Sequence, residues 1–348
     1  METIQQDLAK LKASVEGKQL PQDLSEEIVL RIDQLGRMVD SPTFLPEFDR
    51  LRKYIDWVVG IPWNSRSKDV LDLDFAKKIL DKNHYGLDDI KDRILEYISV
   101  MRLKQEKGER EDVMRAPILC FVGLVGTGKT TIAKSIAQAM GRKFARIPFG
   151  GMGDPLDLRG QSRMHPEAEP GKVVKALRAT GASNPVILLD EIDRVTDEGR
   201  SSIMGVLVEL LDPEQNYAFI DHFIDYPVSL KEVLFIATAN NTHSIATAVM
   251  DRLEPMGMPS YTDQEKITIG QRFMLPKLLI ASGIPDGSFS IDDDVWPTIV
   301  RPLGFDAGIR TLERNIGGAV RKAARMMVEG KVESVRLTTE NAKQYLPQ

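Results

Sequence analysis

The first 60 residues carry apolar side chains at intervals of three or four, which is the spacing of an amphipathic helix. Pro21 and the Ser41-Pro42 pair divide this pattern into three stripes. The stripes consist of Leu8, Leu11 and Val15, then Ile28, Ile32, Leu35 and Met38, then Phe48, Leu51, Ile55 and Val59. The pattern predicts three helices whose apolar faces pack on neighbouring helices or, alternatively, form a surface for a substrate or a partner subunit.

From residue 118 onward, unbroken apolar runs alternate with helical stripes. The runs with the length of buried strands span residues 118–122, 144–147, 186–189 and 233–237. The helices expected between them span residues 131–140, 172–180 and 201–211. This alternation predicts an α/β domain with a parallel sheet that helices cover on both faces.

The segments before and after these strands have other patterns. Residues 65–74 are polar and are expected to form a linker, and helices are expected at 75–81 and 88–104. Beyond residue 260 the pattern is mainly helical. The elements expected there are helices at 263–280 and 308–327 and one short strand at 334–337. This region is therefore predicted to be a separate small helical domain.

The composition is that of an ordinary globular protein and excludes few functions. The chain has 348 residues and a net charge of −5, which gives no reason to expect nucleic acid or an anionic membrane as a partner. Its one cysteine, Cys120, lies in an apolar strand, so we expect no disulfide within the chain and a reducing compartment. The sequence contains no signal peptide pattern, no apolar run long enough to cross a membrane, and no histidine pair with metal-ligand spacing.

Residues 123–130 read G-x-x-x-x-G-K-T and lie between an apolar strand and a helical stripe. This context is the one in which the pattern binds phosphate. Backbone N–H groups of the loop and of the helix start would face phosphate oxygens. Lys129 would reach the β- and γ-phosphates, and the Thr130 hydroxyl would hold Mg²⁺. The alternative interpretation is a glycine turn that binds nothing.

Hydrolysis requires further groups, and the chain offers candidates at the ends of two later strands. Asp190 and Glu191 follow a fully apolar strand. Asp190 would hold a water on Mg²⁺ and Glu191 would polarise the attacking water, unless the pair is only an acidic helix start. Asn240 follows the next strand, where it would orient the water or, alternatively, serve as a turn residue.

Two arginines are candidates for stabilising the charge that develops on the transferred phosphoryl group. They are Arg252, in Met250-Asp251-Arg252-Leu253, and Arg310, in Gly308-Ile309-Arg310-Thr311-Leu312. An arginine of this kind acts within its own chain or on a neighbour. The alternative for both is a surface ion pair.

Taken in order, the phosphate loop, the acidic pair, the asparagine and the two arginines resemble the site of an AAA+ ATPase. Longer strings resemble the ATPase module of the Lon family, the ATP-dependent protease La. These strings are Ile61-Pro62-Trp63-Asn64, His84-Tyr85-Gly86-Leu87, Arg93-Ile94-Leu95-Glu96-Tyr97, Pro170-Gly171-Lys172, and residues 210–216 and 308–314. The resemblance extends over about residues 28–346, which is nearly the whole chain.

The resemblance implies a fold in four parts. They are an N-terminal helical segment at residues 1–60, a linker at 61–84, an AAA+ α/β domain at 85–259 and a small α-helical lid domain at 260–348. It also implies that Asn240 is sensor 1, that Arg252 is an arginine finger acting on the ATP of a neighbour, and that Arg310 is sensor 2 on the lid.

The residues expected around the nucleotide form three groups. Thr130 and Asp190 are expected to hold Mg²⁺. Glu191, Asn240, Arg252 and Arg310 are expected to serve hydrolysis. The residues expected to bind ATP or ADP are Gly123, Gly126, Thr127, Gly128, Lys129, Thr130 and Thr131, with Tyr85 and Gly86 near the adenine by resemblance.

Three features depart from the family pattern. No stretch resembles the Lon nucleophile region, and neither G-x-S-x-G nor H-E-x-x-H occurs, so we expect no peptide cleavage by this chain. In the first pore loop, His165 and Pro166, followed by Glu167, replace an aromatic–aliphatic pair and are expected to grip an extended chain less well. Leu124-Val125 replaces Pro-Pro inside the phosphate loop, which should be tolerated because neither side chain contacts phosphate.

The sequence favours an ATP-driven unfoldase or translocase of protein substrates. Such a protein would form a homo-oligomeric ring, expected to be a hexamer, bind unfolded protein and work with a separate protease partner. Its expected location is the cytoplasm, or the mitochondrial matrix if the sequence is a fragment. A non-threading scaffold or remodeller switched by nucleotide is the alternative that the altered loop suggests. A nucleic-acid motor is the third hypothesis, and the acidic charge balance argues against it.

Overall fold

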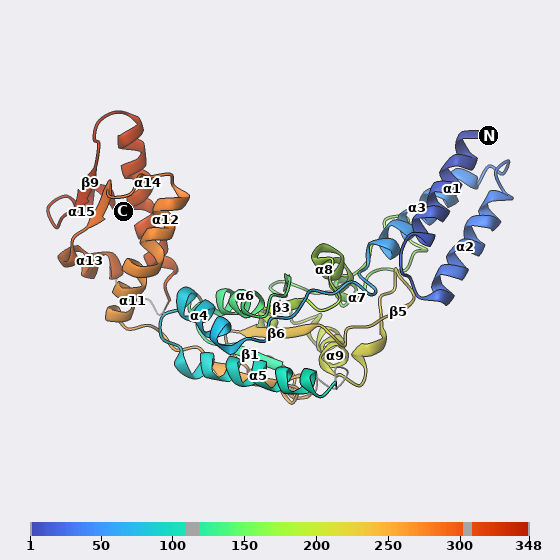
Figure 1. The fold of residues 1–348 in the computed structure, drawn as a ribbon, viewed down its shortest axis with the longest axis horizontal. Helices are drawn as coiled ribbons and strands as arrows, with labels where there is room; N and C mark the ends of the chain where they lie inside the picture. The colour runs from blue at the N-terminus through green and yellow to red at the C-terminus, as the bar shows by residue number, and fades with distance from the viewer. Residues whose placement is uncertain (1, 109–117, 302–307, 347–348) are drawn as a thin grey trace.

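The structure, a computed structural model, describes residues 2–108, 118–301 and 308–346. At its centre lies a parallel sheet of five strands in the order β2-β3-β6-β1-β7 (Figure 1). The strands are β1 (Ile118–Val122), β2 (Phe144–Pro148), β3 (Val186–Asp190), β6 (Leu234–Ala239) and β7 (Leu253–Gly257). The prediction of an α/β domain built on a parallel sheet is confirmed.

Alternate side chains of each strand enter two different hydrophobic clusters, one on each face of the sheet. In β1, Leu119 and Phe121 enter one cluster and Cys120 enters the other. The first cluster also contains side chains of α4 (Leu73–Asn83), α5 (Asp88–Glu106) and α6 (Lys129–Ala139). The second contains side chains of α8 (Lys172–Thr180) and α9 (Arg200–Leu211). Because both faces are covered, the strands read as continuous apolar runs in the sequence.

Strand β7 is the element of the sheet that the apolar pattern did not predict. It contains Pro255 and ends at Gly257, and both residue types are unfavourable inside strands. In the structure β7 is an edge strand that pairs with β1 alone. A proline is tolerated at an edge because one side of the strand needs no hydrogen-bond donors.

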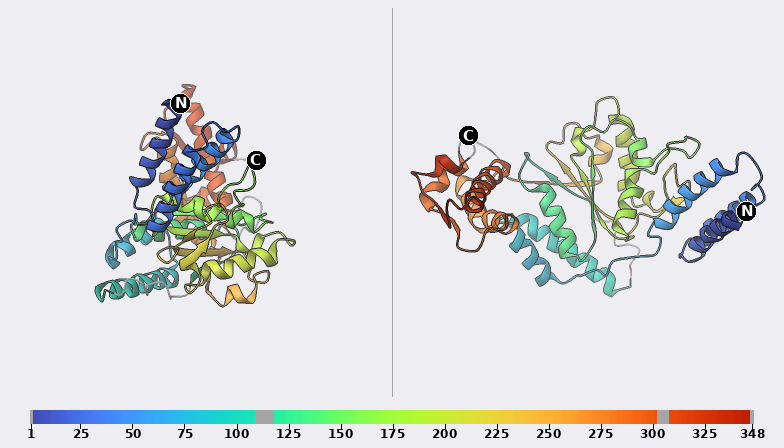
Figure 2. Two further views of the ribbon diagram at one scale, coloured as in Figure 1. Left: turned by 90° about the vertical axis from the view of Figure 1, so that its right-hand side faces the viewer. Right: turned by 90° about the horizontal axis from the view of Figure 1, so that it is seen from above.

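The three N-terminal helices are α1 (Glu2–Glu16), α2 (Gln22–Gly36) and α3 (Phe44–Gly60), as the stripes predict. Their buried residues, including Leu24, Ile28 and Val58, join the same hydrophobic cluster as α8 and α9. The helices form one end of an elongated molecule, the sheet lies in the middle, and the elements from residue 263 onward form the other end (Figures 1 and 2).

Residues 61–84, which we expected to be a linker, are packed onto the α/β domain. The side chains of Ala76 and Leu80 in α4 are fully buried in the cluster that contains α6. In the extended segment before α4, the carboxylate of Asp69 accepts hydrogen bonds of 2.8 and 2.9 Å from Arg142 and one of 3.0 Å from Asn184. The carboxylate of Asp69 therefore belongs to a largely buried ion-pair network rather than to a free connection.

Several short elements connect the long ones. They are α7 (Leu156–Arg159), the 3₁₀ turns at Ile192–Arg194 and Asn216–Ala218, the antiparallel pair β4 (Phe219–Ile220) and β5 (Pro227–Val228), and α10 (Thr247–Met250). Strands β4 and β5 form a short antiparallel hairpin. Together with the loop at residues 160–171, this hairpin faces the N-terminal helices, as described below.

The C-terminal region has its own core and differs in one respect from the mainly helical prediction. Its helices are α11 (Asp263–Ile269), a π-helical turn at Gly270–Met274, α12 (Leu275–Ala281), the 3₁₀ turn Asp293–Val295, α13 (Trp296–Val300), α14 (Arg310–Val328) and α15 (Ala342–Tyr345). Strands β8 (Phe289–Ile291) and β9 (Val335–Leu337) form a small parallel sheet, of which only β9 was expected. A side chain at Gly270 would lie 2.5 Å from Trp296, so this glycine allows the indole to be buried. Within the ranges that the structure describes, no helix is both long and apolar enough to cross a membrane.

Candidate functional site

The phosphate loop lies between β1 and α6 in a conformation that requires its glycines. Gly126 and Gly128 have φ angles of 86° and 95°, a region that is strained for residues with a side chain. A Cβ at Gly123 would lie 2.6 Å from the carbonyl oxygen of Met258. The loop is fixed by side chains as well, because the Thr127 hydroxyl donates to Leu124 O at 2.9 Å and the Thr131 hydroxyl to Gly128 O at 2.7 Å.

Lys129 is the first residue of α6, and its ammonium group points back into the loop. It donates to Gly123 O at 2.6 Å, to Leu124 O at 2.9 Å and to Asn240 Oδ1 at 3.2 Å. Burial lowers the pKa of this lysine, and the carboxylates of Asp190, Asp193 and Glu191 oppose this effect. A cation that is partly desolvated beside carbonyl groups can exchange these weak partners for phosphate oxygens.

Asp190 ends β3 beside the phosphate loop. Its carboxylate lies 3.5 Å from the Thr130 hydroxyl, and Thr238 Oγ1 donates to it at 2.5 Å. Arg146 of β2 donates to its other oxygen at 2.6 Å. The pairing of Thr130 with Asp190 is the arrangement expected of residues that share a hard cation. Thr238 and Arg146 were not predicted, although each is a polar residue inside an otherwise apolar strand.

Glu191 follows Asp190 with a left-handed backbone, at φ 58° and ψ 50°. This conformation costs a residue other than glycine about 1 kcal/mol or more and is often found at functional sites. The Glu191 N–H donates to Thr238 Oγ1 at 2.9 Å, which holds the strained backbone in place. Its half-buried carboxylate lies beside Gly150 and has only Arg194, at 3.9 Å, as an ion-pair partner within the described residues.

Asn240 follows β6, the strand between β3 and β1. Its Oδ1 accepts from Lys129, whereas its Nδ2 is buried and has no hydrogen-bond partner in the described part of the chain. A buried donor without a partner costs about 1–3 kcal/mol. The donor set at this edge of the sheet therefore fits a ligand that supplies oxygen atoms, as a phosphate group or a bound water does.

The structure places the two candidate arginines at opposite ends of β1. Ile309 N–H, next to Arg310, donates to Gly126 O at 3.0 Å, and the Arg310 side chain lies against Gly126. Arg252 O instead accepts from Ile118 N–H, at the first residue of β1. One strand of five residues, about 16 Å, therefore separates Arg252 from the phosphate loop. Its guanidinium donates to Asp212 at 2.8 Å and to Ala248 O at 2.7 Å, and the bond to Asp212 lowers the pKa of that carboxyl.

Tyr85 and Gly86 lie in the turn between α4 and α5. Gly86 has a φ of 61°, and the neighbouring His84 ring is 2.9 Å from Ser135 Oγ on α6. The turn is therefore attached to the helix that begins at the phosphate loop. Tyr261, which no sequence pattern indicated, donates from its buried hydroxyl to Thr127 O at 3.1 Å.

We expect His84 to make the folded chain sensitive to acid. Burial, and then the charge of Lys91, lower the pKa of this histidine to about 4, against about 6.5 in an unfolded chain. Above pH 6.5 the ring is neutral in both states and its stabilisation is fully present. As the pH falls from about 6.5 to 4, only the unfolded chain gains a proton there, so the free energy of unfolding should decrease by roughly 3 kcal/mol.

Urea unfolding at pH 7.5 and pH 5 would test this prediction. His84→Gln should show a smaller loss of stability on acidification than the original chain. His243→Gln is the matched control because His243 is exposed. If both variants lost stability with pH as the original chain does, the acid sensitivity would have another source.

Two family models match the chain. The model of the ATPase family associated with various cellular activities (AAA) matches residues 119–257, and that of the Lon protease AAA+ ATPase lid domain matches residues 281–335. The first contains the phosphate loop, the acidic pair and Asn240, so the chain binds nucleotide and carries an ATPase domain. The second lies within the C-terminal region that has its own core.

Curated relatives are similar along nearly the whole chain. Lon protease 2 of Thermus thermophilus is 40% identical over 347 residues, which cover 98% of this chain and 43% of the relative. Lon protease of Lawsonia intracellularis is 41% identical over 342 residues, and Lon protease of Geobacter metallireducens is 39% identical over 341 residues. Each of these two alignments covers 98% of this chain and 40% of the relative. The chain thus spans about two fifths of the length of these relatives. It belongs to the Lon family, of which it contains the AAA+ ATPase domain and the lid.

Proposed function

We propose that the chain hydrolyses ATP with Mg²⁺ at the phosphate loop and uses the energy to move unfolded polypeptide. One observation carries the proposal. The buried Nδ2 of Asn240, which has no hydrogen-bond partner among the described residues, lies beside Lys129 at the edge of the sheet where β3 ends at Asp190 and Glu191 follows. A phosphate oxygen or a water next to it would satisfy this donor.

The roles of the residues follow from their positions. Lys129 would exchange its carbonyl partners for phosphate oxygens. Thr130 and Asp190 would hold Mg²⁺, which neutralises charge on the phosphates. Glu191 would accept a proton from the attacking water, and Asn240 would orient that water. Arg146 would have to release one oxygen of Asp190 for this arrangement, because its hydrogen bond of 2.6 Å occupies that oxygen.

We further propose that the chain acts in a homo-oligomeric ring, with six subunits by analogy to the family. The position of Arg252 supports assembly, since an arginine about one strand length from its own phosphate loop can serve only the site of a neighbour. Arg310 lies against Gly126 and would serve the site of its own chain.

Peptide cleavage is proposed to lie outside these 348 residues. The sequence contains neither G-x-S-x-G nor H-E-x-x-H. The relatives are named Lon proteases, and the chain covers about two fifths of their length. Polypeptide released by this chain would therefore require a separate protease site for degradation.

Phosphate release in the presence and absence of a denatured protein tests the proposal. We expect slow hydrolysis by the chain alone and hydrolysis several-fold faster when a reduced, carboxymethylated protein is added. The same protein in its folded form is the control and should have little effect. If the rate of hydrolysis did not change when denatured protein was added, the proposed movement of polypeptide would be contradicted. The proposed ATPase site would not be.

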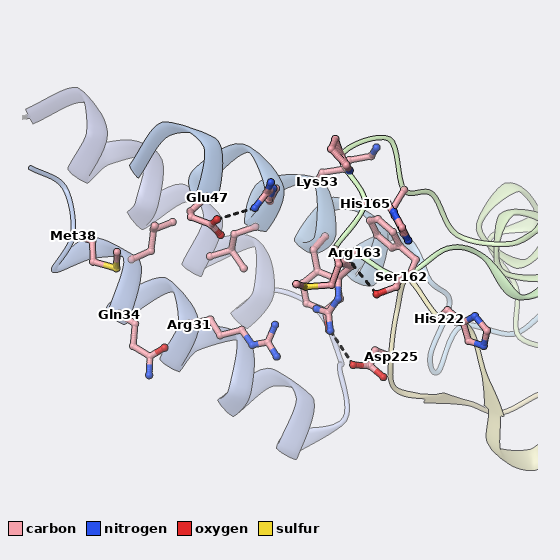
Figure 3. A pocket seen from close by; sticks show the side chains of 18 residues that line it. Arg31, Gln34, Met38, Glu47, Lys53, Ser162, Arg163, His165, His222 and Asp225 are labelled. Carbon is pink, nitrogen blue, oxygen red and sulfur yellow. Dashed lines mark hydrogen bonds and ion pairs between the residues drawn. The ribbon is translucent and has the colours of Figure 1, made fainter. Parts of the chain in front are cut away.

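The loop at residues 160–171 favours a second candidate, a nucleotide-switched scaffold that does not thread polypeptide. Its Arg163 is fixed by Asp225 at 3.2 Å (Figure 3) and by the Tyr54 ring at 4.2 Å, and its tip presents His165 and Pro166. A loop whose position is fixed in this way is poorly suited to binding a polypeptide and moving with it. If the double substitution His165→Tyr, Pro166→Ile gained a hydrolysis response to denatured protein that the original chain lacks, the scaffold would be the better description.

A further inference from the structure

The carboxylate of Asp190 is buried and has one close cation. Arg146, on the neighbouring strand β2, donates from Nε to Oδ2 of Asp190 at 2.6 Å. Among the described residues, no other lysine, arginine or histidine nitrogen lies within 4.0 Å of this carboxylate. A buried carboxylate needs a compensating charge, because burial disfavours an ion more than a neutral group. Arg146 therefore neutralises the residue that is proposed to hold Mg²⁺.

The other partners of this carboxylate are hydroxyl groups. Thr238 Oγ1 donates to Oδ1 at 2.5 Å, and the Thr130 hydroxyl lies 3.5 Å from both oxygens. A separation of 3.5 Å is too long for a strong hydrogen bond between oxygens. Oδ2 thus has Arg146 as its short-range partner. The ion pair and a metal ion on Oδ2 compete for the same lone pairs.

Arg146 reaches this carboxylate from two residues back along the sheet. In the register of β2 and β3, Arg146 lies opposite Leu188, and Pro148 lies opposite Asp190. The side chain of Arg146 must therefore extend along the strand direction to the edge of the sheet where the phosphate loop lies. Only a long side chain spans this distance, and in a short strand with apolar neighbours the charge is otherwise unfavourable.

The two members of the ion pair differ in their access to water. The Arg146 side chain is 50% exposed, whereas that of Asp190 is 4% exposed. Strand β2 is an edge strand of the sheet, so it pairs with β3 alone. A half-exposed guanidinium is hydrated again when it leaves its partner, and this lowers the cost of separation. The buried carboxylate has no such compensation and needs another cation in its place.

We propose that Arg146 is an exchangeable counter-ion of Asp190 that sets how strongly nucleotide binding depends on Mg²⁺. Without a divalent cation, the guanidinium would neutralise the carboxylate, so the phosphates of metal-free nucleotide would not face an uncompensated negative charge. With Mg²⁺ present, the guanidinium would release Oδ2 and turn to solvent. This inference rests on the proposed function, since it assumes that nucleotide and Mg²⁺ bind at the phosphate loop.

Binding of a fluorescent, non-hydrolysable ATP analogue, measured by anisotropy in EDTA and over a series of Mg²⁺ concentrations, tests the proposal. Arg146→Met should weaken metal-free binding about tenfold, because the charge of Asp190 would then repel the phosphates. It should also lower the Mg²⁺ concentration that gives half-maximal binding about tenfold, because the metal would no longer compete with the guanidinium. The ratio of the affinities with and without Mg²⁺ should therefore rise.

Lys143→Met is the matched control. Lys143 is exposed immediately before β2, and its substitution removes the same charge, so neither quantity should change. Thermal unfolding shows whether Arg146→Met folds. Arg146→Lys is the milder change and keeps the charge on a shorter side chain, so it should give intermediate values of both quantities. If either Arg146 variant weakened binding equally with and without Mg²⁺, Arg146 would only support β3 and the proposal would be overturned.

A double-mutant cycle with Asp190→Asn separates neutralisation of Asp190 from direct contact with phosphate. In the Asp190→Asn chain there is no carboxylate charge to neutralise. Adding Arg146→Met should therefore change metal-free binding by less than about twofold. If the second substitution weakened metal-free binding tenfold in this background as well, Arg146 would bind the phosphates itself, and the proposal would be wrong.

The same measurements separate this inference from the proposed function. If the original chain bound the analogue neither in EDTA nor with Mg²⁺, the proposed function would be contradicted, and the role of Arg146 with it. If the original chain bound the analogue and Mg²⁺ strengthened binding, but Arg146→Met behaved like Lys143→Met, only the role of Arg146 would be contradicted.

Discussion

Replacing Glu191 with glutamine is expected to leave ATP binding unchanged and to lower the turnover number by roughly 10²–10⁴-fold. Glutamine has nearly the same shape as glutamate but cannot accept the proton of the attacking water. Lys129, Thr130 and Asp190 are unaffected by the change, so the groups proposed to hold the phosphates and Mg²⁺ remain. Binding of a fluorescent ATP analogue and phosphate release under saturating ATP are the measurements.

Glu198→Gln is the matched control for this experiment. Glu198 lies a few residues further along the chain and is exposed, so its substitution should change neither quantity. A Glu191→Gln chain that still hydrolysed ATP at the original rate would show that another group is the base. A chain that lost binding as well would place Glu191 among the groups that hold the nucleotide.

Replacing Arg252 with alanine is expected to lower the turnover number about 10³-fold, because an arginine that stabilises the transferred phosphoryl group contributes at least this much. The loss should appear only under conditions in which the chain assembles. The substitution also removes the ion pair with Asp212, so thermal unfolding should be measured alongside turnover. Arg272→Ala is the control, since Arg272 is exposed in the C-terminal region.

Mixing the two variants tests whether Arg252 acts on a neighbour. A Glu191→Gln chain retains its arginine, and an Arg252→Ala chain retains its base. In an equal and random mixture, roughly a quarter of the interfaces would join a site with an intact base to an intact arginine. Phosphate release should therefore reappear in the mixture. If the mixture remained as inactive as the separate variants, Arg252 would not act between subunits.

The sequence was most informative where function depends on residues that are adjacent in the chain. The phosphate loop and the Asp190-Glu191 pair each form a short string after an apolar strand, and strand ends of a parallel sheet meet at one edge. The structure accordingly brings Lys129, Asp190 and Asn240 together. Helical stripes likewise predicted α1, α2 and α3, because each helix buries a single face.

Contacts that depend on strand order could not be predicted in this way. Arg146 reaches Asp190 because β2 lies beside β3, and Thr238 reaches it because β6 lies on the other side. The order of the strands in the sheet cannot be predicted from the apolar pattern of any single strand. The buried network of Asp69 was missed for a related reason, since a polar segment reads as solvent-exposed unless its partners are known.

The backbone of the phosphate loop is joined to the C-terminal region on two sides. Gly126 O accepts from the N–H of Ile309, and Thr127 O accepts from the hydroxyl of Tyr261. Tyr261 lies in the stretch between β7 and α11, and Ile309 immediately precedes α14, so the two attachments come from separate parts of the C-terminal region. A rigid-body movement of the C-terminal helices would therefore displace the peptide groups of Gly126 and Thr127 in the phosphate loop. We infer that a change of ligand at the phosphate loop and a movement of the C-terminal region would be coupled through these two hydrogen bonds.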